Sequence, residues 1–134
     1  MPRFADVSHI SFSVRDCEKS AQWWREVFDL GPPVANLDDM DGWRGIVLML
    51  TDHIAIEFQQ HDENQGETFD PLRTGFDHMG LRVDSRAALD EWQAHFEQRG
   101  VVHTPVADRE YGSVLTFKDP DRIQYEMFYM EDHP

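Results

Sequence analysis

Two histidines and two glutamates stand at matched places in this sequence, and they have the chemistry of metal ligands. His9 and His78 lie in segments where polar and apolar residues alternate, and Glu57 and Glu126 lie in strongly apolar segments. Alternate residues of a strand point to the same side, so all four side chains are expected to project away from the apolar side that packs on a helix.

A carboxylate on a mostly apolar strand is costly to desolvate unless a cation compensates its charge. Neutral imidazole combined with carboxylate suits Zn, Ni, Co, Mn or Fe(II). The sequence therefore predicts one divalent metal site that uses His9, Glu57, His78 and Glu126 and keeps positions open for water or substrate. The alternative for any one of them is a hydrogen-bonded structural histidine or a solvated glutamate.

An internal repeat relates these four residues. When the chain is slid over itself by 69 residues without a gap, His9 falls on His78 and Glu57 on Glu126. The same offset matches five more pairs: Val14 with Val83, Trp23 with Trp92, Gly31 with Gly100, Asp52 with Asp121, and Ile54 with Ile123. Their placement indicates a duplicated unit, because the glycines are expected to end helices and the aspartates to lie in final turns.

Each copy has the pattern of a βαβββ module, which predicts an α+β fold. In the first copy we expect a strand over 7–14, a helix that starts after Asp16 and stops at Gly31, and strands near 34, 46–50 and 54–59. The second copy opens with a strand over 77–83 and a helix between Ser85 and Gly100. The chain is therefore expected to form a single domain, with module 1 about 5–60, a polar linker about 61–74 and module 2 about 75–130.

Composition limits the partners. The chain has 134 residues, 40% of them hydrophobic, and a formal charge of −14, which disfavours nucleic acid and acidic membrane surfaces. The longest apolar run, 46–50, is far shorter than the roughly 20 residues of a membrane helix. Cys17 is the only cysteine and no leader pattern is found, so we expect a cytoplasmic protein.

The segments HISFSVRD, DHMGLRV and above all FKDPDRIQYEMF resemble the vicinal oxygen chelate superfamily. This superfamily includes glyoxalase I, fosfomycin-resistance proteins, methylmalonyl-CoA epimerase, extradiol dioxygenases and bleomycin-binding proteins. The resemblance covers nearly the whole chain and implies two tandem βαβββ modules that form a half-open cup-like sheet, the glyoxalase/bleomycin resistance/dihydroxybiphenyl dioxygenase-like fold. It also implies metal ligands on the first and last strands of each module: His9, Glu57, His78 and Glu126.

The spacing of 48 residues between histidine and glutamate in each module resembles the four-ligand pattern of glyoxalase I. That similarity implies a lyase or isomerase that acts on a small oxygen-chelating metabolite through an enolate-type intermediate, with Glu126 or Glu57 moving the proton. The sequence departs from the pattern in two ways. It has no clear counterpart of the residues that grip glutathione, and Arg122 replaces the usual glycine of the DPDG turn.

Alternatives remain open at this stage. Some relatives with a similar PLRTGFDH linkage carry no carboxylate at the position of Glu57, so His61 is a rival ligand, although it also fits a solvated linker residue. An extradiol-type Fe(II) dioxygenase would use His9, His78 and Glu126 alone, and Glu57 argues against it. A fosfomycin-type thiol transferase is a third possibility.

A bleomycin-like antibiotic-binding protein would not be an enzyme. In that case Trp43, Tyr111 and Phe128 would stack on the ligand. Arg82 is expected on the same side of the strand as His78. It could bind a carboxylate or phosphate of the substrate; alternatively, it is solvated or paired with an aspartate. The expected exposed strand edges predict a homodimer, and spacing does not decide whether a metal site lies within one chain or across two.

Overall fold

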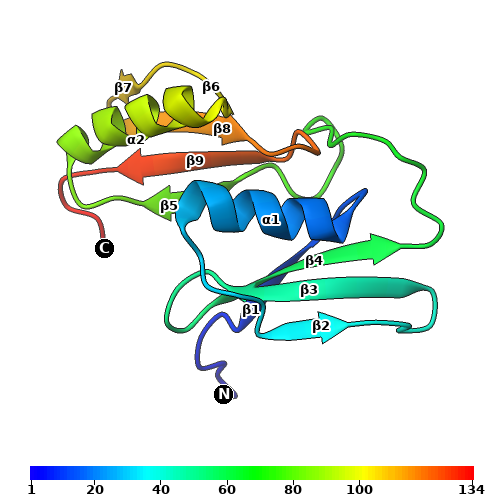
Figure 1. Cartoon of the computed structure of the whole chain (residues 1–134). Coiled ribbons are helices and arrows are strands. Elements are labelled where there is room, and N and C mark those ends of the chain that lie inside the picture. The colour runs from blue at the N-terminus through cyan, green and yellow to red at the C-terminus, as the bar shows by residue number, and fades with distance from the viewer. The chain divides into compact units, whose positions relative to one another are not determined.

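The computed structural model describes residues 1–134, and these form two compact units, residues 1–67 and residues 68–134 (Figure 1). The boundary falls inside the predicted linker. Each unit has one sheet and one long helix, so the predicted mixed α+β fold class is confirmed. No helix is both long enough and apolar enough to span a bilayer.

Unit 1 is a four-stranded sheet with one helix. Its elements are β1 (His9–Ser13), α1 (Cys17–Phe28), β2 (Ala35–Leu37), β3 (Trp43–Met49) and β4 (Ala55–His61). The spatial order of the strands is β1-β4-β3-β2, so the first and last strands of the unit are neighbours and run parallel. This pairing places His9 and Glu57 on adjacent strands.

Unit 2 repeats this arrangement with one change. Its elements are β5 (Met79–Arg82), α2 (Arg86–Arg99), β6 (Val102–His103), β7 (Ala107–Arg109), β8 (Gly112–Lys118) and β9 (Gln124–Tyr129). The order is β5-β9-β8-β6, and β7 also pairs with β8. Two short strands therefore take the place of β2. Pro105 lies between them and has no N–H to donate to a ladder.

The two sheets have the same strand register at the predicted offset of 69 residues. Ser11 is opposite Glu57 in unit 1, and Gly80 is opposite Glu126 in unit 2. The antiparallel pairs agree too, because β3 and β8 occupy positions 43–49 and 112–118 and pair with β4 and β9 in equivalent registers. The repeat seen in the sequence is thus a repeat of backbone hydrogen bonding.

The helix starts were predicted correctly, and one helix end was not. Asp16 caps α1 by accepting the N–H groups of residues 18 and 19 at 3.1 Å, and Ser85 caps α2 by accepting that of residue 88. Gly100 ends α2 in the left-handed conformation. The prediction that Gly31 ends the first helix was wrong. Asp29 adopts the left-handed cap at φ 52°, two residues earlier, as a short polar side chain can.

Several strand boundaries also differ from the prediction. The first strand is shorter than expected, and His78 lies one residue before β5 rather than within it. The last strand of unit 1 is longer than expected, because pairing between Trp43 and His61 extends the β3–β4 ladder. His61 is therefore an exposed strand residue and not part of the linker as predicted.

Each helix packs on the apolar side of its own sheet. In unit 1, Trp24 of α1 is completely buried and its ring stacks on Phe28 at a centroid distance of 4.7 Å. In unit 2, Phe96 of α2 is completely buried against Phe117 of β8. The fully buried strand residues are Leu48, Ile56, Phe58, Leu115, Phe117 and Tyr125. The predicted alternation holds, so the opposite side of each sheet is free to carry polar chemistry.

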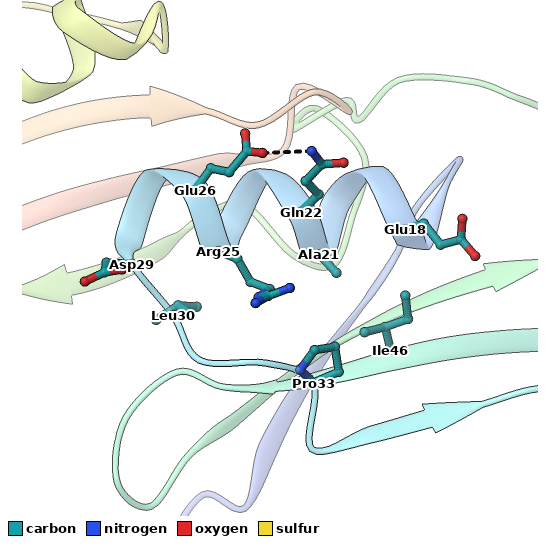
Figure 2. Close-up of a pocket in the computed structure, with 9 residues that line it drawn as sticks. All are labelled: Glu18, Ala21, Gln22, Arg25, Glu26, Asp29, Leu30, Pro33 and Ile46. Atoms are coloured by element: carbon teal, nitrogen blue, oxygen red, sulfur yellow. Dashed lines mark hydrogen bonds between the residues drawn. The ribbon is translucent and has the colours of Figure 1, made fainter.

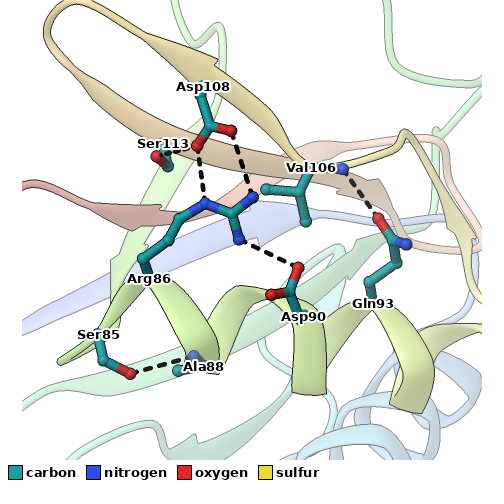
Figure 3. A network of polar contacts seen from close by, with 8 residues as sticks. All are labelled: Ser85, Arg86, Ala88, Asp90, Gln93, Val106, Asp108 and Ser113. Atoms are coloured by element: carbon teal, nitrogen blue, oxygen red, sulfur yellow. Dashed lines mark hydrogen bonds and ion pairs between the residues drawn. The ribbon is translucent and has the colours of Figure 1, made fainter.

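A polar network holds the β7–β8 hairpin to the start of α2 (Figure 3). The Arg86 guanidinium donates to both carboxylate oxygens of Asp108, at 2.7 and 3.3 Å, and to Asp90 at 3.0 Å. Ser113 also donates to Asp108, and these hydrogen bonds hold the pKa of the Asp108 carboxyl below its usual value. The Val106 N–H donates to the Gln93 side chain instead of to a strand. The hairpin that carries Tyr111 is thereby fixed.

Candidate metal-binding site

Unit 2 brings two of the predicted ligands into direct proximity. His78 Nε2 lies 3.5 Å from Glu126 Oε1. Gly80 is the residue opposite Glu126, and a Cβ there would lie 3.7 Å from its Cγ and Oε1, so glycine leaves that flank of the carboxylate open. The side chains are partly exposed, 44% for His78 and 22% for Glu126, so a small ion or a ligand can reach them.

Asp77 contacts the other nitrogen of the same imidazole. Its Oδ1 lies 2.7 Å from His78 Nδ1, and this hydrogen bond is the main reason why the pKa of His78 is raised. Desolvation lowers that pKa, and the negative charge of Glu126 raises it. The sequence analysis did not identify Asp77. The repeat contained the relevant signal, since the offset of 69 pairs it with Ser8, another polar residue directly before a histidine.

Unit 1 holds its glutamate differently. Glu57 is only 8% exposed, and its Oε1 accepts from the Ser11 hydroxyl at 3.1 Å and from the Gln59 amide. Both donors are neutral, and Oε2 accepts no hydrogen bond. His9 is exposed, and its Nδ1 lies 3.0 Å from Ser8 Oγ. It shares the side of Glu57 but the two side chains form no ion pair, because His9 is opposite Ala55 and therefore diagonal to the glutamate.

These residues fit a divalent cation. A largely buried carboxylate with only neutral donors lacks a compensating charge, and a cation near its free oxygen would supply one. His78 with Glu126 offers a nitrogen and an oxygen donor side by side, the donor set expected for Zn, Mn, Co, Ni or Fe. No group of three or more potential ligands gathers in the structure. Each unit by itself presents one histidine and one glutamate of the four predicted ligands.

The geometry of β4 favours Glu57 over His61 as a partner of His9. His9 is opposite Ala55, and His61 is six residues further along β4, about 20 Å away at the rise of an extended strand. His61 instead lies near Trp43, with a ring centroid distance of 6.5 Å. The rival ligand thus lies at the far end of the strand.

Three of the four predicted substrate-contacting residues lie together in unit 2 around Phe128, which is two residues along β9 from Glu126. The rings of Tyr111 and Phe128 stack with centroids 6.3 Å apart and planes within 15°. Arg82 is opposite Phe128 in the β5–β9 register, is exposed and forms no ion pair. His133 packs edge-on against Phe128 at 5.9 Å, and nothing in the sequence singles it out. Trp43, the fourth predicted residue, belongs to unit 1.

A hollow in unit 1 lies away from these candidate ligands (Figure 2). Its volume is about 540 Å³, and it lies between α1 and the helix-facing side of β3, where Arg25 points toward Pro33 and Ile46. Ile46 is opposite Phe58, a buried residue of the helix-facing side, whereas Glu57 points to the other side. The hollow therefore does not belong to the predicted metal site.

The protein is a duplicated one of the mixed α+β class. Its two units have the same strand register, and each carries a histidine and a glutamate on the side of the sheet away from its helix. A family model of the Glyoxalase/Bleomycin resistance protein/Dioxygenase superfamily matches residues 6–127. The chain belongs to this superfamily, as the sequence resemblance predicted.

Solved structures share the fold of this chain. The glyoxylase/bleomycin resistance protein/dioxygenase domain from Frankia sp. EAN1pec is 28% identical, with a TM-score of 0.85 over 96% of this chain and 100% of that one. The fosfomycin resistance protein FosX from Mesorhizobium loti is 21% identical, with a TM-score of 0.70 over 97% of this chain and 95% of that one. A mutant FosX from Listeria monocytogenes, complexed with Mn(II) and 1S,2S-dihydroxypropylphosphonic acid, is 18% identical, with a TM-score of 0.71 over 97% of this chain and 96% of that one.

Proposed function

We propose that this protein is a metal-dependent lyase or isomerase that acts on a small metabolite with two neighbouring oxygen atoms. The observation that carries the proposal is the approach of His78 Nε2 to Glu126 Oε1 at 3.5 Å on the open side of the sheet. His9 and Glu57, at equivalent positions of unit 1, are proposed as the other two ligands. A divalent cation held by these residues supplies Lewis-acid stabilisation of negative charge on substrate oxygens.

We assign the proton transfer to Glu126. Glu57 is held in place by the Ser11 and Gln59 donors, whereas the structure gives Glu126 only His78 as a polar partner. A carboxylate with few hydrogen bonds can approach a carbon acid, take its proton and return it to the adjacent carbon. Glu57 then remains a fixed ligand throughout the reaction.

The surroundings of Glu126 indicate how the substrate is oriented. The stacked rings of Tyr111 and Phe128 offer a flat apolar surface, and the unpaired guanidinium of Arg82 offers a charged group beside it. A planar part of the substrate would lie on the rings, and a carboxylate or phosphate would meet Arg82. These contacts would position the reacting carbons next to Glu126.

Metal content is the first test. We expect the purified protein, refilled with Zn, Ni, Co, Mn or Fe(II) and dialysed, to retain about one metal ion per site, and His78→Ala and Glu126→Ala to lose it. His95→Ala and Glu131→Gln are matched controls at other positions, and His61→Ala tests the rival ligand. Retention of iron in preference to the other metals would favour a ring-cleaving dioxygenase. A folded protein that retains no metal would contradict the proposal and favour ligand sequestration.

Activity is the second test. The metal-loaded protein is screened with 2-oxoaldehyde adducts and acyl-CoA epimers, and Glu126→Gln is compared with wild type on any substrate found. We expect Glu126→Gln to lose at least about a hundredfold in turnover, as removal of a general base typically does, while its circular dichroism stays unchanged. Glu131→Gln should keep full activity. Normal turnover by Glu126→Gln would contradict the assignment of Glu126.

A second candidate activity is the modification of a phosphonate such as fosfomycin. It is supported by the unpaired Arg82 on the side of His78, since a guanidinium pairs well with phosphonate oxygens. The test adds fosfomycin to the metal-loaded protein, with and without a thiol, and follows its consumption by ³¹P NMR. Thiol-dependent consumption that disappears in Arg82→Ala would favour this activity over the first.

A further inference from the structure

Both candidate histidines have their Nδ1 held by the residue directly before them, but the two holding groups differ in charge. In unit 2 the group is the carboxylate of Asp77, 2.7 Å from His78 Nδ1. In unit 1 it is the hydroxyl of Ser8, 3.0 Å from His9 Nδ1. Ser8 and Asp77 are themselves related by the offset of 69 residues. The same contact therefore occurs twice in the fold, once with an anion and once with a neutral group.

This difference matters for metal binding because a ligating imidazole must offer an unprotonated nitrogen. An ionised carboxylate can only accept, so its contact with His78 requires the proton to be on Nδ1, which leaves the lone pair on Nε2. Nε2 is the atom that lies 3.5 Å from Glu126 Oε1. When the ring is neutral, two acceptors therefore face each other, and a cation bound between them would satisfy both. The hydroxyl of Ser8 can donate or accept and does not fix the tautomer of His9.

A second contact secures the backbone of Asp77. The side-chain amide of Gln124 donates to the carbonyl oxygen of Asp77 at 3.2 Å. Gln124 belongs to β9 and lies two residues before Glu126, so this contact ties the segment before β5 to the strand that carries the glutamate. Ala55 takes the equivalent place in unit 1 and has no side chain that can make such a contact.

We propose that Asp77 is a positioning residue that fixes His78 in the Nδ1–H tautomer and strengthens the binding of a cation to His78 and Glu126 of unit 2. This inference rests on the proposed metal-binding function. Carboxylates that orient ligating histidines typically contribute about ten- to a hundredfold to metal affinity, because they hold the ring and increase its basicity. A serine in the same place contributes less, because its hydrogen bond carries no charge.

The experiment exchanges the two holding groups. Asp77→Ser gives unit 2 the arrangement of unit 1, and Ser8→Asp does the reverse. Asp84→Asn is the matched control, because it removes one exposed carboxylate beyond the far end of β5 and keeps the same net charge as Asp77→Ser. Affinities for Zn(II) and Co(II) are measured by competition with a chelator. Long-range ¹H–¹⁵N spectra of the metal-free proteins above pH 9 report the tautomer of the neutral His78 ring.

We expect Asp77→Ser to bind metal about ten- to a hundredfold more weakly than Asp84→Asn and to shift His78 toward the Nε2–H tautomer. Ser8→Asp should increase the affinity. If wild type binds metal and Asp77→Ser matches Asp84→Asn, the role of Asp77 is wrong while the proposed function stands. If wild type binds no metal, both proposals fail. An unchanged tautomer in Asp77→Ser would contradict the orienting role even if the affinity fell.

Discussion

The carboxyl group of Asp119 makes the stability of unit 2 depend on pH in an unusual direction. It lies in the turn before β9 and is only 6% exposed. Its Oδ1 accepts the N–H groups of Asp121 and Ile123 at 2.9 and 3.0 Å, and its Oδ2 accepts the Tyr125 hydroxyl at 2.9 Å. Burial raises the pKa of Asp119 to about 6, and these hydrogen bonds oppose that rise only in part.

The sign of the effect follows from proton linkage. Because the pKa is higher in the folded state than the value of 3.8 for a free carboxyl group, the folded protein binds more protons between these two values. The contribution of Asp119 to the free energy of unfolding is therefore fully present below about pH 4 and is lost as the pH rises through about 6. A shift of roughly two pKa units corresponds to about 3 kcal/mol.

Asp119→Asn isolates this contribution, because asparagine retains an acceptor oxygen for the two N–H groups and does not titrate. We expect wild type to lose about 2 kcal/mol relative to Asp119→Asn between pH 4 and pH 7, measured by urea unfolding at each pH. Carboxyl groups that do not interact with Asp119 affect both proteins equally and cancel in the difference. Asp132→Asn, an exposed position, should show no such trend.

Asp119→Ala removes the acceptor altogether, whereas Asp119→Asn keeps one. It leaves two backbone N–H groups and the Tyr125 hydroxyl without their acceptor, and each such loss costs about 1–3 kcal/mol. We expect it to destabilise the protein by about 3 kcal/mol or more at every pH. A difference between wild type and Asp119→Asn that stays constant from pH 4 to pH 7 would refute the reasoning.

Substitutions at two further positions, Arg122 and Gly112, test the backbone of unit 2. Arg122 has φ 64°, so Arg122→Gly should raise the free energy of unfolding by about 0.5–1 kcal/mol by relieving left-handed strain, while Arg122→Ala should give no such gain. Gly112 has φ 152°, and a Cβ there would lie 2.5 Å from the Tyr129 carbonyl oxygen and 2.9 Å from the Phe128 ring. Gly112→Ala should therefore lower the free energy of unfolding by about 1–3 kcal/mol. Urea unfolding checks both, and Gly112→Ala should also alter the near-ultraviolet circular dichroism of the aromatic pair. A neutral Gly112→Ala would contradict the close approach.

Most of the fold could be predicted because it depends on local and periodic signals. Alternation located the buried sides of the strands, the caps Asp16 and Ser85 located the helix starts, and the offset of 69 residues anticipated equal registers in both sheets. The errors arose where tertiary pairing or an uncommon residue decided the boundary. Asp29 took the left-handed conformation expected of Gly31, and pairing with Trp43 kept His61 in β4.

Only one feature of the candidate site could be predicted from the sequence: the side of the sheet on which its residues lie. A period of two places Glu57 and Glu126 away from the core, but it does not determine which atoms they contact. The contacts depend on the residues opposite them on the neighbouring strands. Ser11 donates to Glu57, whereas Gly80 leaves Glu126 open and allows it to approach His78.

Duplication explains why the two units have the same strand register although the contacts of their histidines and glutamates differ. The backbone ladders have the same register in both units, so a substitution at a neighbouring position changes the contacts of a candidate ligand without moving its strand. Unit 1 has donors around its glutamate and a neutral hydroxyl on its histidine. Unit 2 has an open glutamate and a carboxylate on its histidine. Ser11 and Gln59 thus hold Glu57 on β4, whereas Gly80 leaves Glu126 open on the equivalent strand β9. The proposed reaction, with one fixed and one mobile carboxylate, would require this division.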